Sequence, residues 1–548
     1  MEKLDYSNKT CLVVEDRRPF MLLLKGLLAN LGAGKVISEQ SAEAALRTCR
    51  VQKIDIIVCD LHLGVNRKNG FEFLEEVRKD KIIKPSTVFI MISGESSRSM
   101  VLGSIEKQPD DYLVKPFSQA QLNARIARAT MRRTTLSALY SQIDHNKLDL
   151  AIQTCKHYLE TEPRYTSQLL KYLVQLYWKT KKYSAAEQLL QQILDERPMH
   201  WAAVAMAKTK FLLGNYEEAI DLGKKVIEQS RNTVEAYDIV ADALLMSDKK
   251  SDALKYIQEA LSLSPLSIDR HFKVCKISRE NENYDIAMTS ARSIYELSQR
   301  SVHKNVNHMC SYIRSILDVA ENSGEKKDKN RFLQEALLTM QRAQTNESAN
   351  GKDEGFNFGL FESLVQARMQ FIEGKTTEAK RSLENVQIEI EQEFAEYPLS
   401  MAPDSLKLML DLGDFEEATK LSKLLGENID MLDPSIAHQV ELVMKNNAEK
   451  RQDYILHNKK GIEHYSKGSF HQAYEEFINA KNISPLNIGV NLNLLQSLVK
   501  LIKSTKGANS AFLDEAKSVY RFIENMPLKA THMKKFANMQ GEVKEAIT

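Results

Sequence analysis

Five side chains with reactive groups follow directly after short apolar runs of the sequence. Glu15 and Asp16 follow the run CLVV, and Asp60 follows IIVC. The hydroxyl of Ser93 follows VFIMI, and the ammonium of Lys115 follows DYLV. If these runs are parallel strands of one sheet, the side chains that follow them meet at its carboxyl edge. Three carboxylates, a hydroxyl and an ammonium would then share a small volume.

The chemistry that such a group favours is phosphoryl transfer assisted by a metal ion. Three carboxylates placed together repel one another, and a cation offsets that repulsion. Oxygen ligands of this kind suit Mg²⁺, which keeps several waters and readily accepts a phosphoryl oxygen. An aspartate in this setting can attack phosphorus while the metal and a lysine stabilise the transferring group. The hydroxyl of Ser93 can hydrogen-bond to the phosphoryl oxygen afterwards.

The elements that must hold these groups are indicated by residues 9–130. Short apolar runs alternate there with amphipathic stretches such as MLLLKGLLANLG, GFEFLEEVRKD and SMVLGSIEK. Strands that alternate with helices indicate a parallel sheet covered on both faces. Such a sheet presents its functional groups where the carboxyl ends of the strands open into loops.

Four motifs in order, VVED, IIVCDLHLG, MISGE and DYLVKPF, resemble those of the receiver domain of two-component response regulators. The resemblance covers residues 9–130 and implies a doubly wound, flavodoxin-like α/β fold with a five-stranded parallel sheet. It also implies roles for individual residues. Asp60 is the phosphoacceptor, and Lys115 pairs with the phosphoryl group. Ser93 and Tyr112 form the switch, and Mg²⁺ is held by Glu15, Asp16, Asp60 and the backbone carbonyl of His62. It implies further that the Lys115–Pro116 bond is cis.

The chain departs from the common receiver pattern in two places. Its acidic pair is Glu15-Asp16 rather than the commoner Asp-Asp, and the loop from Asp60 to Gly70 is longer than usual. Gly64 stands in this loop where proline is frequent, so we expect the loop to be more mobile. Ser93 and Tyr112 fit the family's switch positions, which favours a working receiver.

Beyond about residue 135 the strands end and alanines recur at a fixed spacing. Ala186, Ala219, Ala253 and Ala287 lie 33, 34 and 34 residues apart, which indicates a repeat. In several copies a proline follows twelve residues after the alanine, as Pro198 follows Ala186. Proline there stops one helix pair before the next begins.

Glycines mark the turn inside several copies of the repeat. Gly214, Gly413 and Gly468 each lie five residues before a repeat alanine, where a small residue lets the chain reverse. The pattern resembles tetratricopeptide repeats, which are helix hairpins that stack into an all-α superhelix. The resemblance is good over residues 140–300 and 455–500 and looser over 370–425.

We therefore predict four segments. They are a receiver domain at 9–130, tetratricopeptide repeats at 131–300, an irregular helical segment with exposed loops at 301–365, and further repeat-like and C-terminal helices at 366–548. The exposed loops are expected at SGEKKDKN (323–330) and TNESANGKDEG (345–355).

Composition limits the location and the partners. The chain has 75 Lys+Arg and 73 Asp+Glu, which argues against nucleic acid as its main partner. Its six cysteines are scattered without a CxxC pair, as suits a reducing cytoplasm. No apolar stretch reaches the length of a membrane helix. We expect a cytoplasmic, bacterial-type protein without a membrane partner.

The expected function is that of a response regulator in a phosphorelay. A sensor histidine kinase or phosphotransfer protein would phosphorylate Asp60, and the repeats would bind an unidentified protein as output. No motif of a metabolic enzyme stands out, so we do not expect the chain to be an enzyme. Two alternatives remain open. One is a phosphate sink or inhibitory scaffold that binds a kinase or rival regulator regardless of its own phosphorylation, and the other is an RNA-binding repeat protein.

Overall fold

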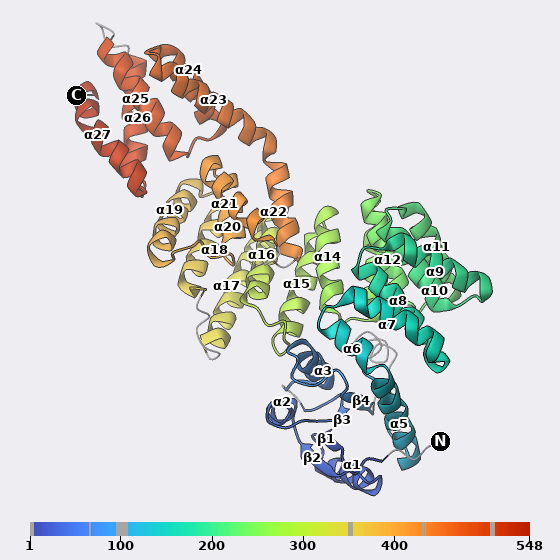
Figure 1. Cartoon of the computed structure of the whole chain (residues 1–548). Helices are drawn as coiled ribbons and strands as arrows, with labels where there is room; N and C mark the ends of the chain where they lie inside the picture. The colour runs from blue at the N-terminus through green and yellow to red at the C-terminus, as the bar shows by residue number, and fades with distance from the viewer. Residues whose placement is uncertain are drawn as a thin grey trace. The chain divides into compact units, whose positions relative to one another are not determined.

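The computed structural model describes residues 5–64, 67–94, 108–348, 355–429, 432, 434–504 and 510–547. Its contacts divide the chain into two compact units. The first unit contains Met1–Asn283 with Arg292–Asn305, and the second contains Tyr284–Ala291 with Val306–Thr548. Figure 1 labels most of the elements of both units along the chain.

The first unit begins with a five-stranded parallel sheet. Its strands are β1 (Thr10–Val14), β2 (Lys35–Glu39), β3 (Ile56–Asp60), β4 (Val88–Ser93) and β5 (Asp111–Val114), in the order β2-β1-β3-β4-β5. Every residue of β3 and β4 is buried, because helices cover both faces of a parallel sheet. The strand order reverses between β1 and β3, which opens a crevice at their carboxyl ends. The doubly wound fold expected from the sequence is confirmed.

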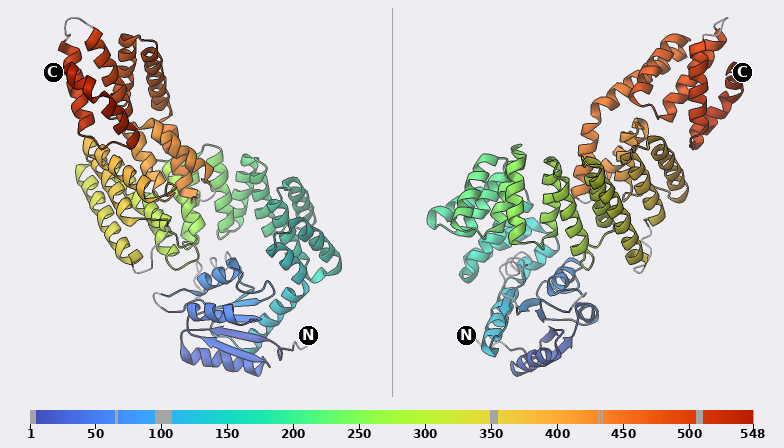
Figure 2. Two further views of the ribbon diagram at one scale, coloured as in Figure 1. Left: turned by 60° about the vertical axis from the view of Figure 1, so that its left-hand side comes forward. Right: turned by 180° about the vertical axis from the view of Figure 1, so that it is seen from behind.

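Helices of the described part of the chain cover both faces of this sheet (Figure 2). Helices α2 (Ala42–Val51) and α3 (Gly70–Lys79) share one apolar core with the sheet, and α1 (Arg18–Asn30) and α5 (Gln119–Thr135) share the other. Capping boxes at Asn69 and Ser118 fix the starts of α3 and α5. The helix expected from SMVLGSIEK (99–107) lies outside the described residues.

Helix hairpins follow the sheet in the first unit. They are α6 (Ser137–Asp144), α7 (Leu148–Thr161), α8 (Thr166–Lys179), α9 (Tyr183–Glu196), α10 (His200–Leu212), α11 (Tyr216–Gln229), α12 (Val234–Met246), α13 (Lys250–Leu263), α14 (Ile268–Glu280) and α15 (Tyr284–Ser298), which crosses the boundary between the units. Leu136, fully buried, separates α5 from α6, so the receiver's last helix leads directly into the first hairpin. The repeat alanines are all buried, as packing residues of paired helices should be.

The described residues of the second unit form helices joined by short connections. They are α16 (Val306–Asn322), α17 (Lys326–Ser348), α18 (Phe358–Ile372), α19 (Thr376–Glu393), α20 (Ala402–Asp411), α21 (Phe415–Glu427), α22 (Pro434–Asn446), α23 (Ala448–Ser466), α24 (Phe470–Ile483), α25 (Ile488–Ser504), α26 (Ser510–Glu524) and α27 (Ala530–Ile547). The helical-repeat class expected after the receiver is confirmed. Among the described residues, no helix combines the length and apolar character needed to cross a membrane.

The loops expected near residues 323–330 and 345–355 need a correction. Helix α17 already begins at Lys326 and runs to Ser348, so residues 326–330 and 345–348 are helical. The charged side chains of 325–327 are exposed as expected, but lysine and glutamate also have high helix propensity. A charged, exposed run therefore does not by itself distinguish a loop from a solvated helix. Residues 349–354 lie outside the described part of the chain.

Candidate functional site

Strand pairing brings three carboxylates together at the carboxyl edge of the sheet. In the parallel register of β1 and β3, Val14 lies opposite Cys59, so Glu15 and Asp60 extend from neighbouring strand ends. Asp16 follows in the loop before α1. One ligand oxygen each from Glu15, Asp16 and Asp60 lies within 4.8 Å of the others. The structure thus assembles the acidic group that strand ends predicted.

Lys115, the residue directly after β5, joins this group. Its Nζ lies 2.7 Å from Asp60 Oδ2 and 2.9 Å from Glu15 Oε2, and it donates a hydrogen bond to each. The same ammonium lies 4.1 Å from the centre of the Phe20 ring, a cation–π contact. The Lys115–Pro116 bond is cis, as the resemblance implied.

Burial makes the charges of this site costly. Glu15 is fully buried, and burial raises its pKa to about 7; the charge of Asp60 adds to the rise, and Lys115 offsets only part of it. Asp60 is also buried, and its Oδ1 has no hydrogen-bond partner among the residues that the structure describes. Among the described residues, the group of three carboxylates is thus offset by the ammonium of Lys115, which bonds to two of them.

This donor set fits a divalent metal ion. Hard oxygen ligands with excess negative charge are those that Mg²⁺ prefers, and the unpartnered oxygen of Asp60 leaves a position for a ligand bond. Glu15, Asp16 and Asp60 are therefore the residues that would hold the ion. His62, two residues beyond Asp60, has an exposed side chain, and the part assigned to its backbone carbonyl stays a prediction.

The expected switch residues lie on the neighbouring strands. Ser93 is fully buried at the end of β4, and its carbonyl accepts a hydrogen bond from the amide of Lys115 at 2.8 Å. Tyr112 lies on β5 opposite Met91 and packs, half-buried, against the core shared with α2 and α3. Ser93 thus lies at the edge of the sheet that holds Asp60. Tyr112 lies three residues before Lys115, further from that edge. Their switching role stays a prediction.

Two residues near the site were missed by the sequence reasoning. A Cβ atom at Gly70 would lie only 2.5 Å from the carbonyl oxygen of Asp60, so glycine lets α3 approach the end of β3. Phe20 carries the ring beside Lys115, and no local pattern marked it as different from the other apolar residues of α1. Gly64 has a φ of 104°, which explains glycine at that point of the loop.

Comparison with known proteins agrees with this geometry. Residues 11–127 match the family model of the response regulator receiver domain, and residues 142–211 match that of the tetratricopeptide repeat. The chain is 32% identical over 142 residues to the alkaline phosphatase synthesis transcriptional regulatory protein PhoP of Bacillus subtilis, covering 26% of this chain and 56% of that protein. It is 26% identical over 126 residues to the chemotaxis protein CheY-3 of Vibrio cholerae, covering 23% of this chain and 95% of that protein.

Among solved structures, the receiver domain of the Francisella response regulator 1452 matches at 26% identity and a TM-score of 0.21, covering 23% of this chain and 98% of that one. The chain spans about half the length of several transcriptional regulators that it matches. The family model of the receiver domain covers the N-terminal sheet with its helices, and the family model of the repeat covers part of the helices that follow. The chain therefore carries a response regulator receiver domain at its N-terminus, and tetratricopeptide repeats follow it.

Proposed function

We propose that this chain is a phosphorelay response regulator that accepts a phosphoryl group on Asp60 and passes the signal on through its repeats. A histidine kinase or phosphotransfer protein is the expected donor, and a protein bound by the repeats is the expected output partner. The chain's own chemistry is then modification of itself rather than turnover of a metabolite. The cytoplasmic location expected from the sequence stays a prediction.

The observation that carries this proposal is the unequal environment of the two carboxylate oxygens of Asp60. Oδ2 accepts a hydrogen bond from Lys115, whereas the buried Oδ1 has no such partner among the described residues. An oxygen without a donor keeps its lone pairs available for attack on phosphorus. In transfer from a phosphohistidine, an oxygen of Asp60 bonds to phosphorus and the bond from phosphorus to the imidazole nitrogen breaks. The nitrogen keeps the electron pair.

The surrounding residues of the chain orient and stabilise this transfer. Lys115 holds Asp60 through Oδ2 and presents a positive charge where the phosphoryl oxygens would gather. Ser93 lies at the end of the adjacent strand, from which its hydroxyl can donate to a phosphoryl oxygen. Glu15, Asp16, Asp60 and the carbonyl of His62 would hold Mg²⁺, which when bound supplies positive charge against the incoming phosphoryl group.

Contacts inside the first unit support an output through the repeats. His303 Nε2 lies 2.8 Å from Glu75 Oε1 of α3, and Lys79 donates to the carbonyl of Val302 at 3.3 Å. Lys81, just beyond α3, donates to the carbonyl of Asp144 at the end of α6 at 2.8 Å. The receiver therefore touches the first hairpin and the segment after α15. A change of state at Asp60 that moves α3 would reach both contacts.

Intact-mass spectrometry tests the phosphorylation directly. The full chain is incubated with acetyl phosphate and Mg²⁺, alongside the variants Asp60→Asn and Asp80→Asn, the latter changing an exposed aspartate at the end of α3. We expect one phosphoryl adduct on the wild type and on Asp80→Asn, none on Asp60→Asn, and none when EDTA replaces Mg²⁺. An adduct that persists in Asp60→Asn would place the phosphoacceptor elsewhere and overturn the proposal.

A further inference from the structure

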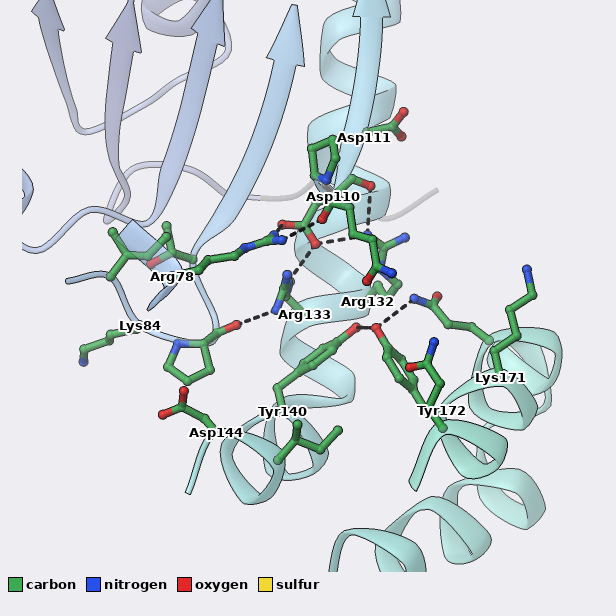
Figure 3. Close-up of a pocket in the computed structure, with 18 of the residues that line it drawn as sticks. Arg78, Lys84, Asp110, Asp111, Arg132, Arg133, Tyr140, Asp144, Lys171 and Tyr172 are labelled. Atoms are coloured by element: carbon green, nitrogen blue, oxygen red, sulfur yellow. Dashed lines mark hydrogen bonds and ion pairs between the residues drawn. The ribbon is translucent and has the colours of Figure 1, made fainter. Parts of the chain in front are cut away.

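A cavity of about 600 Å³ lies in the first unit where the receiver meets the first hairpins. Figure 3 shows its walls, which come from the loop before β4, the start of β5, the end of α5, and helices α6 and α8. Asp110 and Asp111 line it at the amino end of β5, whereas Lys115 and Asp60 lie at carboxyl ends of their strands. The cavity is therefore at the opposite edge of the sheet from the phosphoacceptor.

One buried carboxylate in this cavity is shared by three guanidinium groups. Asp110 accepts from Arg133 Nε at 2.7 Å and from Arg132 Nη2 at 3.1 Å through the same oxygen. Its other oxygen accepts the backbone amide of Phe89 at 2.9 Å and lies 3.6 Å from Arg78 Nη2. Only 3% of the Asp110 side chain is exposed, against 15% to 31% for the three arginines. The cluster has an excess of two positive charges.

Nearby carboxylates do not balance this excess. Asp111 is paired with Arg125 and Arg128 at 2.9 and 2.6 Å, and neither of those arginines lines the cavity. Asp144 lies 3.6 Å from Lys81. Lys84 and Lys171 add two further cations to the walls. The positive charge of the cavity is therefore uncompensated by the described residues around it.

Two buried N–H groups of the cluster also lack an acceptor. Arg132 Nε and Arg78 Nη2 have no hydrogen-bond partner among the described residues, since 3.6 Å from Nη2 to Asp110 is too long for one. A buried N–H group of a charged side chain destabilises the protein when it makes no hydrogen bond. Both donors belong to side chains that line the cavity. An anion in the cavity would satisfy donors and charge together.

Aromatic rings form the wall on the repeat side. Tyr140 and Tyr172 meet edge to face at 5.8 Å, their hydroxyls are 3.4 Å apart, and Gln168 donates to Tyr172 at 3.3 Å. Arg133 lies 4.4 Å from the centre of the Tyr140 ring. Ligand sites typically combine a volume of this size with apolar walls and a few convergent polar groups.

We propose that this cavity binds a small organic anion, a metabolite that carries a phosphate or carboxylate group. The oxyanion would accept hydrogen bonds from Arg132 and Arg78, and the rest of the molecule would pack against the tyrosines. Such a ligand would hold the receiver against the first hairpins, because one wall of the cavity belongs to the receiver and the other to helices α6 and α8. Asp60, Glu15, Asp16 and Lys115 do not line this cavity, although the predicted switch residue Tyr112 does.

Isothermal titration calorimetry on the full chain tests the proposal. The protein and buffer are first freed of metal ions on a chelating resin, so that metal-mediated binding at the acidic site does not contribute. The probes are citrate, pyrophosphate and AMP, with adenosine as the uncharged counterpart of AMP. We expect at least one anionic probe to bind with a stoichiometry of one per chain, and adenosine not to bind. Citrate alone would indicate a carboxylate ligand, and pyrophosphate or AMP alone a phosphate ligand.

Variants assign the binding to this cavity. Arg132→Gln and Lys171→Gln should each weaken binding, by roughly tenfold to a hundredfold for Arg132→Gln, which loses a charged donor. Lys179→Gln, which changes an exposed lysine on the same helix as Lys171 outside the cavity, and Asp60→Asn should leave affinity unchanged. If Arg132→Gln fails to fold, Lys171→Gln decides, because its side chain is at the surface. Absence of binding by all three anions, or unchanged affinity in the folded cavity variants, would overturn the proposal.

Discussion

At the scale of single residues, the receiver site depends on one lysine and one glycine. Lys115 bonds to both Glu15 and Asp60, so it holds the proposed phosphoacceptor Asp60 and offsets part of the buried negative charge. Gly70 lies behind Asp60, where an added Cβ atom would be 2.5 Å from the Asp60 carbonyl oxygen and 2.8 Å from Met91 Sδ. Since one of these atoms belongs to the backbone and the other to a fully buried side chain, there is little room to adjust.

The variant Gly70→Ala should therefore destabilise the receiver by about 1–3 kcal/mol, because the new methyl group forces the end of β3 away from α3. It should also slow phosphorylation by acetyl phosphate, since Asp60 is part of the displaced strand end. Denaturant unfolding followed by circular dichroism measures the first effect, and the rate of adduct formation in intact-mass spectrometry measures the second.

Gly26→Ala supplies the matched control. Gly26 lies within α1, and nothing lies within 4 Å of the position of its added Cβ atom. Alanine there should stabilise the helix by roughly 0.5–1 kcal/mol. Equal stability of the two variants would contradict the steric role assigned to Gly70.

At the scale of elements, one backbone feature recurs through the repeats. In eight hairpins the residue five positions before the buried repeat alanine has a φ between 56° and 85°. Glycine occupies this position at Gly214, Gly374, Gly413 and Gly468, and Asn146, Lys181, Asp248 and Glu282 occupy it in the others. The tight connection between paired helices thus imposes a left-handed residue whatever the sequence offers.

This recurrence shows why the repeat turns were only partly predictable. Gly214, Gly413 and Gly468 were expected from the sequence, and the structure confirms turns there. Lys181 and Glu282 carry no local signal for a left-handed conformation, because packing of the helices selects it. For residues 326–330 the prediction was wrong, because a run of exposed charged residues was taken to indicate a loop and is the start of α17.

Replacing Lys181 with glycine should stabilise the first hairpins by about 0.5–1 kcal/mol, because it removes the steric strain of a left-handed non-glycine residue at a smaller cost in chain entropy. Thermal and denaturant unfolding of the full chain measure the change. Lys179→Gly, two residues earlier and still within α8, should instead destabilise by about 1 kcal/mol. A loss of stability in both variants would contradict the strain at Lys181.

At the scale of the whole first unit, the site and the cavity differ in how far sequence reasoning could reach. The grouping of Glu15, Asp60 and Lys115 was predictable because each of them comes at the end of an apolar run that itself indicates a strand. The cavity was not, because Asp110, Arg133 and Tyr172 belong to a loop, the end of α5 and a repeat helix whose meeting depends on how the receiver packs against the hairpins. Local patterns place residues on elements, and only tertiary packing brings separate elements into one wall.

The same packing leads to a prediction about signal output. Glu75 on α3 contacts His303, and Lys79 contacts the carbonyl of Val302, so α3 and residues 302–303 are held together. If phosphorylation at Asp60 shifts α3, these contacts change, and amide exchange in residues 299–305 should change with them. Allosteric couplings of about 1–3 kcal/mol correspond to roughly 5-fold to 150-fold changes in an equilibrium. Hydrogen–deuterium exchange of the full chain, with and without fluoroberyllate and Mg²⁺, measures this change.

Two variants separate coupling from other effects of the reagent. Asp60→Asn should show no fluoroberyllate-dependent change in residues 299–305, since it lacks the acceptor carboxylate. Glu75→Gln should still bind fluoroberyllate at the acidic site. The change in amide exchange of residues 299–305 should be smaller, because the variant lacks the charge that faces His303. If fluoroberyllate binds to the wild type but amide exchange in this segment does not change, α3 does not carry the signal into the repeats. Among the described contacts, those that remain are the passage of α5 into α6 and the bond from Lys81 to the carbonyl of Asp144, and amide exchange in α6 would be measured next.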